Sequence, residues 1–518
     1  MSMSIVVEFE DFYWKYKSSK DLVLNSINLK INQNEFIGIM GPTGAGKSTL
    51  CSCINGLIPL KTRGWIKGSV NVLGMNTKKV KISDLGTKVG LVFQDPETQF
   101  IMMTVEDEIA IGLETLRLER TEIKARIKWA LELVGLEGFE QKSPEELSGG
   151  QKQLIAIASI MAMRPQILIL DEPTSDLDPN GKQHIFQVLE QIRKKFDLTI
   201  ILVTHESKKV LQFCTRVIVL DCGKVVFDGV PKKLMSNEQL IDETGICNPE
   251  KIASVVENLI QSSQINTLDN YEMNLHQNSI ISFDNISYTY PNGTQALKDV
   301  SLNIKTGAFL AIIGKNGSGK TTLIKHINGL IKPQSGNVNI KNESIKDYSI
   351  SSISQTIGYC YQNPDHQLFK NTIREEIEFG LLNLKIDKEE IEKRYNKIVD
   401  LLNLRKFEEI YESTFYLSKG IRQRLALASV LVLEPEILII DEPTTGQDFL
   451  MIKEFMKILQ DLNKENHTII IVTHDPFVIS NYSKEIIIMS DGHVIKHLST
   501  IEFLKNKELQ DIAAFVPV

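Results

Sequence analysis

One glycine-rich pattern occurs twice in the chain and restricts its fold more than any other feature. Residues 41–49 read GPTGAGKST and residues 314–322 read GKNGSGKTT, and both match G-x-x-x-x-G-K-[ST]. In such a loop the glycines let backbone N–H groups converge on phosphate oxygens, and the following helix directs its positive end at them. Each copy follows a strand-like apolar run and precedes a helix-compatible one. We therefore expect two nucleotide-binding sites.

Two side chains of each loop have a direct part in this chemistry. We expect Lys47 and Lys320 to reach the β- and γ-phosphates, and the hydroxyls of Ser48 and Thr321 to ligate Mg²⁺. The loop residues expected to bind the nucleotide are Gly41, Pro42, Thr43, Gly44, Ala45, Gly46, Lys47, Ser48, Thr49, Gly314, Lys315, Asn316, Gly317, Ser318, Gly319, Lys320, Thr321 and Thr322.

Length and composition fit two domains that each bury a core. The chain has 518 residues, and the internal repeat favours two units over more. Acidic residues outnumber basic ones, 65 against 58, so no global positive field attracts nucleic acid. The six cysteines contain no C-x-x-C pair, and no run approaches the roughly 18 apolar residues of a membrane span. We expect a cytoplasmic protein that reaches a membrane only through a partner.

Each half opens with a short strand that ends in tyrosine ahead of the phosphate loop. Alternation of apolar and polar residues predicts these strands, so Tyr16 and Tyr290 could be half-buried strand residues. We favour a role in stacking on adenine, because each tyrosine stands where its strand runs into a turn.

Two acids follow an apolar run in each half. The runs Ile-Leu-Ile-Leu and Ile-Leu-Ile-Ile are typical of strands buried on both faces of a parallel sheet. Asp171 and Asp441 come first and are expected to hold Mg²⁺, directly or through water. The next carboxylates, Glu172 and Glu442, can orient a water molecule for attack on the γ-phosphate.

Between the first loop and these acids lies Leu-Ser-Gly-Gly-Gln at residues 147–151, and with this motif the chain resembles ATP-binding-cassette (ABC) ATPases in tandem. The resemblance implies Q-loop glutamines (Gln94, Gln362), switch histidines (His205, His474) and D-loop aspartates (Asp178, Asp448). It implies that the catalytic residues are Glu172, Glu442, His205, His474, Gln94 and Gln362. It implies that Mg²⁺ contacts Ser48, Gln94, Asp171, Thr321, Gln362 and Asp441. It adds Ser148, Gly149, Gly150, Gln151, Ser418 and Gly420 to the ATP-binding residues, beside Tyr16 and Tyr290.

The resemblance also implies the fold and its boundaries. We expect an α/β protein of two tandem P-loop domains, each with a RecA-like core, an antiparallel β subdomain and an α-helical signature subdomain. The first domain is placed at residues 1–264 and the second at 279–518. Residues 265–278 are polar and rich in Asn, Gln and Ser, which predicts a flexible linker.

The second half departs from the pattern at its signature. It reads Leu-Ser-Lys-Gly-Ile at residues 417–421, with Lys419 and Ile421 in place of Gly149 and Gln151. We expect the small residues to matter because this turn begins a helix whose N–H groups meet the γ-phosphate on the opposite domain, and a lysine cannot copy a glycine-only backbone angle. One of two composite sites is therefore expected to be altered.

The segment after each Q-loop glutamine indicates which branch of the family the chain resembles. Both copies share Q-x-P-x-x-Q followed by T-[VI]-x-x-E-I-x-x-G-L, which resembles ATPases of energy-coupling-factor importers for vitamins, vitamin precursors and transition-metal ions. In that family the segment receives coupling helices of a transmembrane subunit. We expect replacement of Gln99, Glu108, Gln367 or Glu376 to weaken this association. A generic surface helix of another transport ATPase is the alternative.

Three other classes share parts of this pattern. Ribosome-associated twin cassettes have basic interdomain linkers, whereas residues 236–279 contain one basic residue and seven acids. DNA-repair cassettes need long heptad arms or zinc motifs. Sugar-importer ATPases differ only in the Q-loop segment. The resemblance implies a peripheral protein at the cytoplasmic membrane face with head-to-tail pairing of its domains, a transmembrane coupling subunit, a substrate-binding membrane subunit and no nucleic acid.

Overall fold

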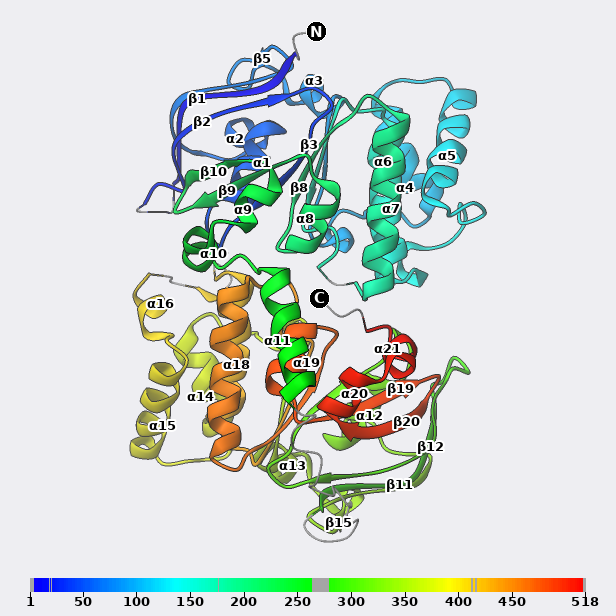
Figure 1. The fold of residues 1–518 in the computed structure, drawn as a ribbon, viewed down its shortest axis with the longest axis vertical. Coiled ribbons are helices and arrows are strands. Elements are labelled where there is room, and N and C mark those ends of the chain that lie inside the picture. The colour runs from blue at the N-terminus through cyan, green and yellow to red at the C-terminus, as the bar shows by residue number, and fades with distance from the viewer. Residues whose placement is uncertain are drawn as a thin grey trace. The chain divides into compact units, whose positions relative to one another are not determined.

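The computed structural model describes residues 4–17, 19, 21–175, 177–262, 279–410, 413–414 and 417–515. Contacts divide the chain into two compact units, residues 1–248 with 448–450 and residues 249–447 with 451–518. Each unit contains one copy of the repeat and is described by itself (Figure 1).

The first unit contains an antiparallel sheet whose strands lie on both sides of the phosphate loop in the sequence. Its strands are β1 (Ile5–Tyr16), β2 (Leu24–Asn32), β4 (Gly64–Val72) and β5 (Met75–Asn76), in the order β2-β1-β4-β5. The inward side chains of β1, including Phe9, Phe12 and Trp14, are buried. This sheet is the predicted antiparallel β subdomain.

A second, mostly parallel sheet forms the centre of the first unit. It contains β3 (Phe36–Met40), β6 (Val89–Val92), β7 (Ile167–Asp171), β8 (Thr199–Val203), β9 (Arg216–Asp221) and β10 (Lys224–Gly229), in the order β10-β9-β3-β8-β7-β6. Only β10 pairs antiparallel to its neighbour. The phosphate loop leaves β3, which lies between β8 and β9, so the loop stands beside the strand ends that carry the other site residues.

Helices fill the connections of the first unit. They are α1 (Lys47–Ile54), α2 (Leu57–Leu60), α3 (Ile82–Gly86), the 3-10 turn η1 (Pro96–Thr98), α4 (Val105–Thr115), α5 (Arg120–Val134), η2 (Pro144–Glu146), α6 (Gly149–Ala162), α7 (Pro179–Lys195), α8 (Ser207–Phe213), α9 (Pro231–Met235) and α10 (Glu238–Thr244). Helices α4, α5 and α6 pack on one another and form the predicted helical subdomain.

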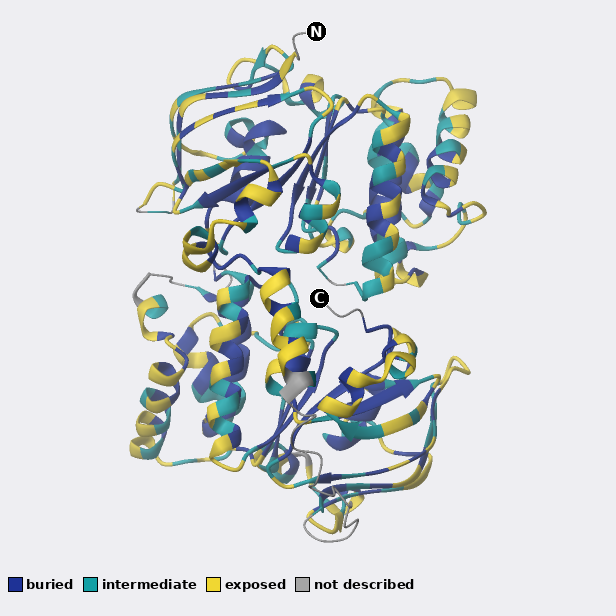
Figure 2. Ribbon diagram, in the orientation of Figure 1, coloured by how far each residue is buried: buried dark blue, intermediate teal, exposed yellow. Residues whose placement is uncertain are grey.

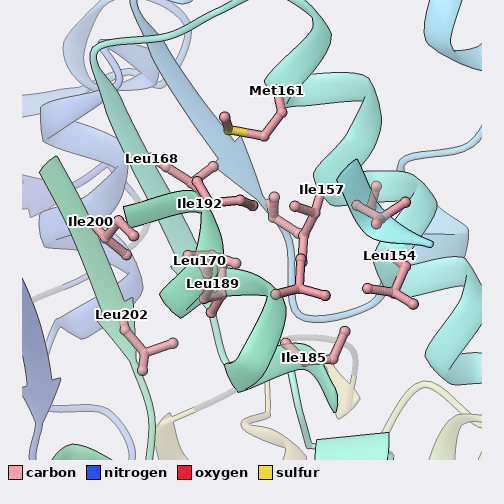
Figure 3. Packing of buried hydrophobic residues seen from close by; sticks show 14 of the residues in the cluster. Leu154, Ile157, Met161, Leu168, Leu170, Ile185, Leu189, Ile192, Ile200 and Leu202 are labelled. Carbon is pink, nitrogen blue, oxygen red and sulfur yellow. The ribbon is translucent and has the colours of Figure 1, made fainter. Parts of the chain in front are cut away.

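The core of the first unit lies on both faces of the parallel sheet (Figure 2). Leu168 and Leu170 of β7 pack against α6 and α7, where Figure 3 shows Ile157 and Leu189 beside them. Their neighbours on β7, Ile167 and Ile169, pack into the cluster under the antiparallel sheet. The prediction of a strand buried on both faces is confirmed.

The second unit repeats this architecture. Its antiparallel sheet has the order β12-β11-β14-β15 and its mostly parallel sheet the order β16-β17-β18-β13-β19-β20. The strands are β11 (Ser279–Thr289), β12 (Gln295–Lys305), β13 (Phe309–Ile313), β14 (Ser335–Ile340), β15 (Glu343–Ser344), β16 (Ile357–Cys360), β17 (Ile437–Asp441), β18 (Thr468–Val472), β19 (Glu485–Ser490) and β20 (His493–Ser499). The predicted α/β class with two RecA-like cores is therefore confirmed.

Most helices of the second unit have a counterpart in the first, and one long helix is an addition. They are α12 (Lys320–Ile327), η3 (Ile345–Asp347), α13 (Ile350–Thr356), η4 (Pro364–His366), α14 (Ile373–Asn383), α15 (Lys388–Leu401), α16 (Arg405–Ile410), α17 (Lys419–Leu431), α18 (Phe449–Lys464), α19 (Pro476–Tyr482), α20 (Thr500–Lys505) and α21 (Lys507–Ile512). The addition, α11 (Pro249–Ser262), packs on α20 and is grouped with the second unit, although the sequence places it at the end of the first domain. The predicted linker 265–278 lies outside the described residues.

No helix in the described part of the chain is both long and apolar enough to cross a lipid bilayer.

Candidate nucleotide-binding sites

The two phosphate loops have the conformation that their glycines predict. Gly41 has φ of 134°, and a Cβ atom there would lie 1.9 Å from the carbonyl oxygen of Leu220. Gly314 has φ of 148°, and its Cβ would lie 2.2 Å from the carbonyl oxygen of Met489. Only glycine fits at either position, so the close passage of each loop over the neighbouring strand end requires that residue.

The lysine of each loop turns back over the loop that precedes it. Lys47 Nζ donates to the carbonyl oxygens of Gly41 at 2.8 Å and Pro42 at 3.0 Å. Lys320 Nζ makes the matching bonds to Gly314 at 2.6 Å and Lys315 at 2.9 Å. Burial lowers the pKa of Lys47 from its ordinary value, opposed first by the charge of Glu172. Each ammonium group is thus held over the concave face of its loop, where phosphate oxygens would enter.

A hydroxyl and a carboxylate converge behind each loop. Burial raises the pKa of Asp171, and a hydrogen bond from Ser48 opposes the shift. Burial likewise raises the pKa of Asp441 to about 6, opposed first by a hydrogen bond from Tyr359 and later by one from Thr321. A desolvated carboxylate beside a hydroxyl is a position that favours a cation.

The two strand-end tyrosines are anchored on the loop helices. Tyr16 Oη lies 3.0 Å from Thr49 Oγ1, and Tyr290 Oη lies 3.1 Å from Thr322 Oγ1. Both rings are partly buried, and each packs edge to face on the aromatic residue two positions earlier, Trp14 or Tyr288. The hydroxyls are committed to the protein, so a base could contact the tyrosines only through their rings.

In the first unit the predicted glutamate, histidine and glutamine come together. His205 Nε2 lies 3.0 Å from Glu172 Oε1, and Gln94 Nε2 donates to Glu172 Oε2 at 3.4 Å. Glu172 follows β7 with φ of 48°, in the left-handed region that residues with a Cβ rarely adopt. Strained backbone of this kind is concentrated at functional sites.

The second unit repeats the pair of histidine and glutamate with looser spacing, and Gln362 is exposed. His474 Nε2 lies 3.5 Å from Glu442 Oε1, and Glu442 has φ of 46°. Tyr359 Oη donates to Asp441 Oδ2 at 3.4 Å, whereas the matching position in the first unit is Leu91. Tyr359 was not among the predicted site residues, although a tyrosine three residues before the Q-loop glutamine is a visible difference between the halves.

The signature turns differ in a way that the sequence analysis did not expect. Gly149 and Gly150 do not have left-handed φ, and a Cβ on either would make only ordinary contact with Leu177. Neither glycine therefore has a glycine-only backbone angle, and the expectation that a lysine cannot copy it is wrong. The local difference is the cap: Ser148 and Gln151 form a reciprocal capping box on α6, at 3.0 and 3.3 Å. Ser418, the counterpart of Ser148, stands at the N-cap position of α17, and its side chain makes no capping hydrogen bond.

The second glycine of the altered signature does have a steric role. A Cβ on Gly420 would lie 2.4 Å from Met451 Sδ, and Ile421 is buried where Gln151 is partly exposed. Of the D-loop aspartates, Asp178 caps α7 by accepting from the Gly181 N–H at 2.7 Å, and Asp448 stands at the matching place before α18. Asp178 therefore has a structural explanation in addition to the predicted one.

The repeated segment after the Q-loop glutamine uses its shared acids internally. Glu108 accepts from the N–H groups of Ile101 and Met102, both at 2.9 Å, and is 5% exposed. In the second unit Glu376 accepts from Phe369 and Lys370 at 2.9 and 2.7 Å and is 3% exposed. Both acids bond to the backbone of their own segment, and the expectation that their replacement weakens association with a membrane partner stays a prediction.

The two shared glutamines are also turned inward. Gln367 Oε1 accepts from the Tyr361 N–H at 3.2 Å, and its Nε2 donates to the Ala426 carbonyl at 2.8 Å. Gln99 Oε1 accepts from the Phe93 N–H at 3.5 Å. The residues that project from the segment are Ile101, Met103 and Phe369, which are 69%, 87% and 57% exposed. In the sequence, these exposed residues could have been found as large apolar residues that stand between the polar positions of the shared motif.

Comparison with known proteins gives the family. A family model described as ABC transporter matches residues 24–175 and 297–445, and each segment contains one phosphate loop and its acids. A protein of Caldanaerobacter subterraneus subsp. tengcongensis with the name "Putative ABC transporter ATP-binding protein" is 38% identical over 527 residues, covering 96% of this chain and 92% of that protein. One of Methanosarcina mazei is 36% identical over 544 residues, covering 99% and 92%.

A solved structure is also similar over one half of the chain. It is cbiO1 from Clostridium perfringens, described as part of the ABC transporter complex cbiONQ. It is 38% identical, covers 45% of this chain and 94% of that chain, and has a TM-score of 0.41. A TM-score this low leaves the family assignment to the sequence matches. On those matches the chain belongs to the ABC transporter family, as an ATPase with two ATP-binding domains.

Proposed function

We propose that the chain is the ATP-hydrolysing subunit of a membrane importer of the energy-coupling-factor type, which drives uptake of a vitamin, a vitamin precursor or a transition-metal ion. The observation that carries this proposal is the repeated segment Q-x-P-x-x-Q…T-[VI]-x-x-E-I-x-x-G-L at residues 94–114 and 362–382. In both units the shared acid, Glu108 or Glu376, accepts hydrogen bonds from the backbone of a short tip at residues 101–103 or 369–370. The apolar side chains of this tip project outward. A tip of this construction is suited to a protein partner, because exposed apolar residues on rigid backbone bind with little loss of conformational entropy.

Within each unit we assign the ATP phosphates to the loops with Lys47 and Lys320, and the bases to Tyr16 and Tyr290. Glu172 with His205, and Glu442 with His474, would orient the attacking water, and the histidine contacts support this assignment. The Q-loop glutamines, of which Gln94 already contacts Glu172, complete the catalytic set.

The residues behind the loops fit Mg²⁺. Within the described ranges no group of three or more His, Cys, Asp or Glu could hold a metal ion. Mg²⁺ commonly needs only one or two protein carboxylates, with phosphates and water as its other ligands. Ser48 with Asp171, and Thr321 with Asp441, would hold the ion, joined by Gln94 and Gln362. When bound, the ion neutralises charge on the phosphate oxygens.

We further infer that the two domains, residues 1–264 and 279–518 joined by the linker 265–278, close head to tail over two ATP molecules. Each ATP would then lie between the phosphate loop of one domain and the signature of the other. The chain would bind peripherally at the cytoplasmic face of the membrane, next to a transmembrane coupling subunit and a substrate-binding membrane subunit.

Affinity purification from membranes of cells that express the tagged chain tests this proposal. Integral membrane proteins should copurify, and the double variant Met103→Ser with Phe369→Ser should lose them while it keeps ATP binding. The matched control is Val226→Ser with Leu330→Ser, at exposed apolar positions outside the segment, 43% and 58% exposed. Copurification with ribosomes, or uptake of a sugar by the reconstituted complex, would contradict the proposal.

A further inference from the structure

A charged residue that the sequence analysis did not single out stands next to the first switch histidine. Glu206 follows His205 in the turn after β8, and its side chain is 25% exposed. Its Oε1 accepts a hydrogen bond from Thr174 Oγ1 at 2.9 Å and lies 3.0 Å from Lys182 Nζ. Thr174 is 2% exposed, and Lys182 lies in the first turn of α7.

These contacts complete a small ring that includes Glu172 and His205, the pair expected to orient the attacking water. Thr174 lies two residues after Glu172, and Glu206 lies one residue after His205. The strands β7 and β8 are paired up to Asp171 and Val203, so the two turns leave the sheet side by side. The Thr174–Glu206 bond therefore ties the turns together just beyond the 3.0 Å contact between Glu172 and His205. Lys182 places a positive charge against this partly buried carboxylate.

The second unit is built differently at these positions. Asp475 follows His474, and its shorter carboxylate caps α19 by accepting from the Phe477 N–H at 2.9 Å. The position of Lys182, four residues after the D-loop aspartate, is taken by Ile452, which has no charge to pair. The contact between His474 and Glu442 is 3.5 Å, against 3.0 Å in the first unit.

We propose that Glu206 is a positioning residue of the first site: together with Thr174 and Lys182 it fixes His205 against Glu172. It has no contact with nucleotide in this role and acts only through the histidine. The inference rests on the proposed roles of Glu172 and His205 in hydrolysis. It gives the first half a preorganised pair of its own, independent of the signature that would reach it from the other half.

A spectroscopic test reads the position of His205 without using activity. In the full chain labelled at its nine histidines, the His205 side-chain resonance is assigned by its loss in His205→Gln. Glu206→Ala and Thr174→Val should each shift and broaden this resonance. Glu206→Gln, which keeps an oxygen acceptor for Thr174, should leave it close to its wild-type position. Asp475→Asn is the matched control in the second half and should not move it.

A kinetic test uses the same variants in a Glu442→Gln chain, in which turnover comes from the first site. Glu206→Ala should lower kcat about tenfold, the loss expected for one well-formed hydrogen bond, and leave the KM for ATP unchanged. Glu206→Gln should restore most of the rate, and combining Glu206→Ala with Thr174→Val should add no further loss. Thermal unfolding of each variant shows whether it is folded.

The outcomes separate this inference from the proposed function. A His205 resonance that stays in place in both Glu206→Ala and Thr174→Val would overturn the positioning role, whatever the rates. If His205→Gln and Glu172→Gln leave turnover of the Glu442→Gln chain unchanged while the resonance moves as expected, the assigned catalytic roles fail and the positioning of His205 stands.

Discussion

Glu108→Ala should loosen the backbone tip that carries Ile101 and Met103. The wild-type carboxylate is 5% exposed and accepts two backbone hydrogen bonds, each 2.9 Å long. A hydrogen bond to a charged group contributes about 1.5 kcal/mol at the low end, so losing both costs about 3 kcal/mol. Because each 1.4 kcal/mol changes an equilibrium constant tenfold, the amides of Ile101 and Met102 should exchange with solvent about 100-fold faster. Hydrogen exchange read out by mass spectrometry or NMR measures this directly.

Two variants and one control sharpen the test. Both bonds are accepted by the same oxygen of Glu108. Glu108→Gln keeps one side-chain oxygen without the charge, so exchange at the same amides should rise only about tenfold. Glu376→Ala should have the same effect on the amides of Phe369 and Lys370 as Glu108→Ala has on the first tip. Glu106→Ala, on the same helix but bonded to Gln141, should leave the tip protected. Wild-type protection of Ile101 and Met102 in Glu108→Ala would show that other contacts hold the tip and that the bracing argument is wrong.

Lys47→Ala combined with Lys320→Ala should abolish Mg-ATP binding and hydrolysis, since both ammonium groups lie over their loops; unchanged turnover would place the ATP elsewhere. Under the proposed pairing only the second site meets an intact signature, so Glu442→Gln should lower turnover of the assembled complex on the order of 10²-fold and Glu172→Gln far less. Equal losses would argue against this asymmetry. Burial raises the pKa of Asp441 to about 6 from 3.8, so the folded state binds the proton more tightly. Without nucleotide the free energy of unfolding should therefore fall as the pH rises between these two values. Asp441→Asn should flatten this slope in thermal unfolding, and a slope like that of the wild type would exclude Asp441 as its source.

The parts of the site that follow from local chain chemistry could be predicted from the sequence. A phosphate loop needs glycine where the backbone turns left-handed beside another strand, and Gly41 and Gly314 meet that need in the structure. The four aliphatic residues before Asp171 and Asp441 predicted strands buried on both faces, which places each acid at the same edge of its own sheet as the phosphate loop of that half. Motif order then identified His205 and His474.

Side-chain direction and packing between distant segments could not be predicted in this way. A glutamate repeated in both halves, such as Glu108, has the same sequence signal whether it faces a partner or accepts backbone N–H groups from a loop seven residues earlier. The helix α11 precedes the linker in the chain, yet Ile252 and Val256 are buried and the helix packs on α20. Chain order carries no information about that contact, so the sequence placed α11 in the first domain.

The left-handed backbone at Glu172 and Glu442 has a consequence for protein engineering. A residue with a Cβ in this conformation costs roughly 1–2 kcal/mol, and glycine at the same position costs almost nothing. Each half is therefore less stable than its own backbone would allow, by the amount needed to hold a carboxylate at that point. A library selected for heat resistance alone would be drawn to glycine at these two positions and would lose ATP turnover as it gained stability.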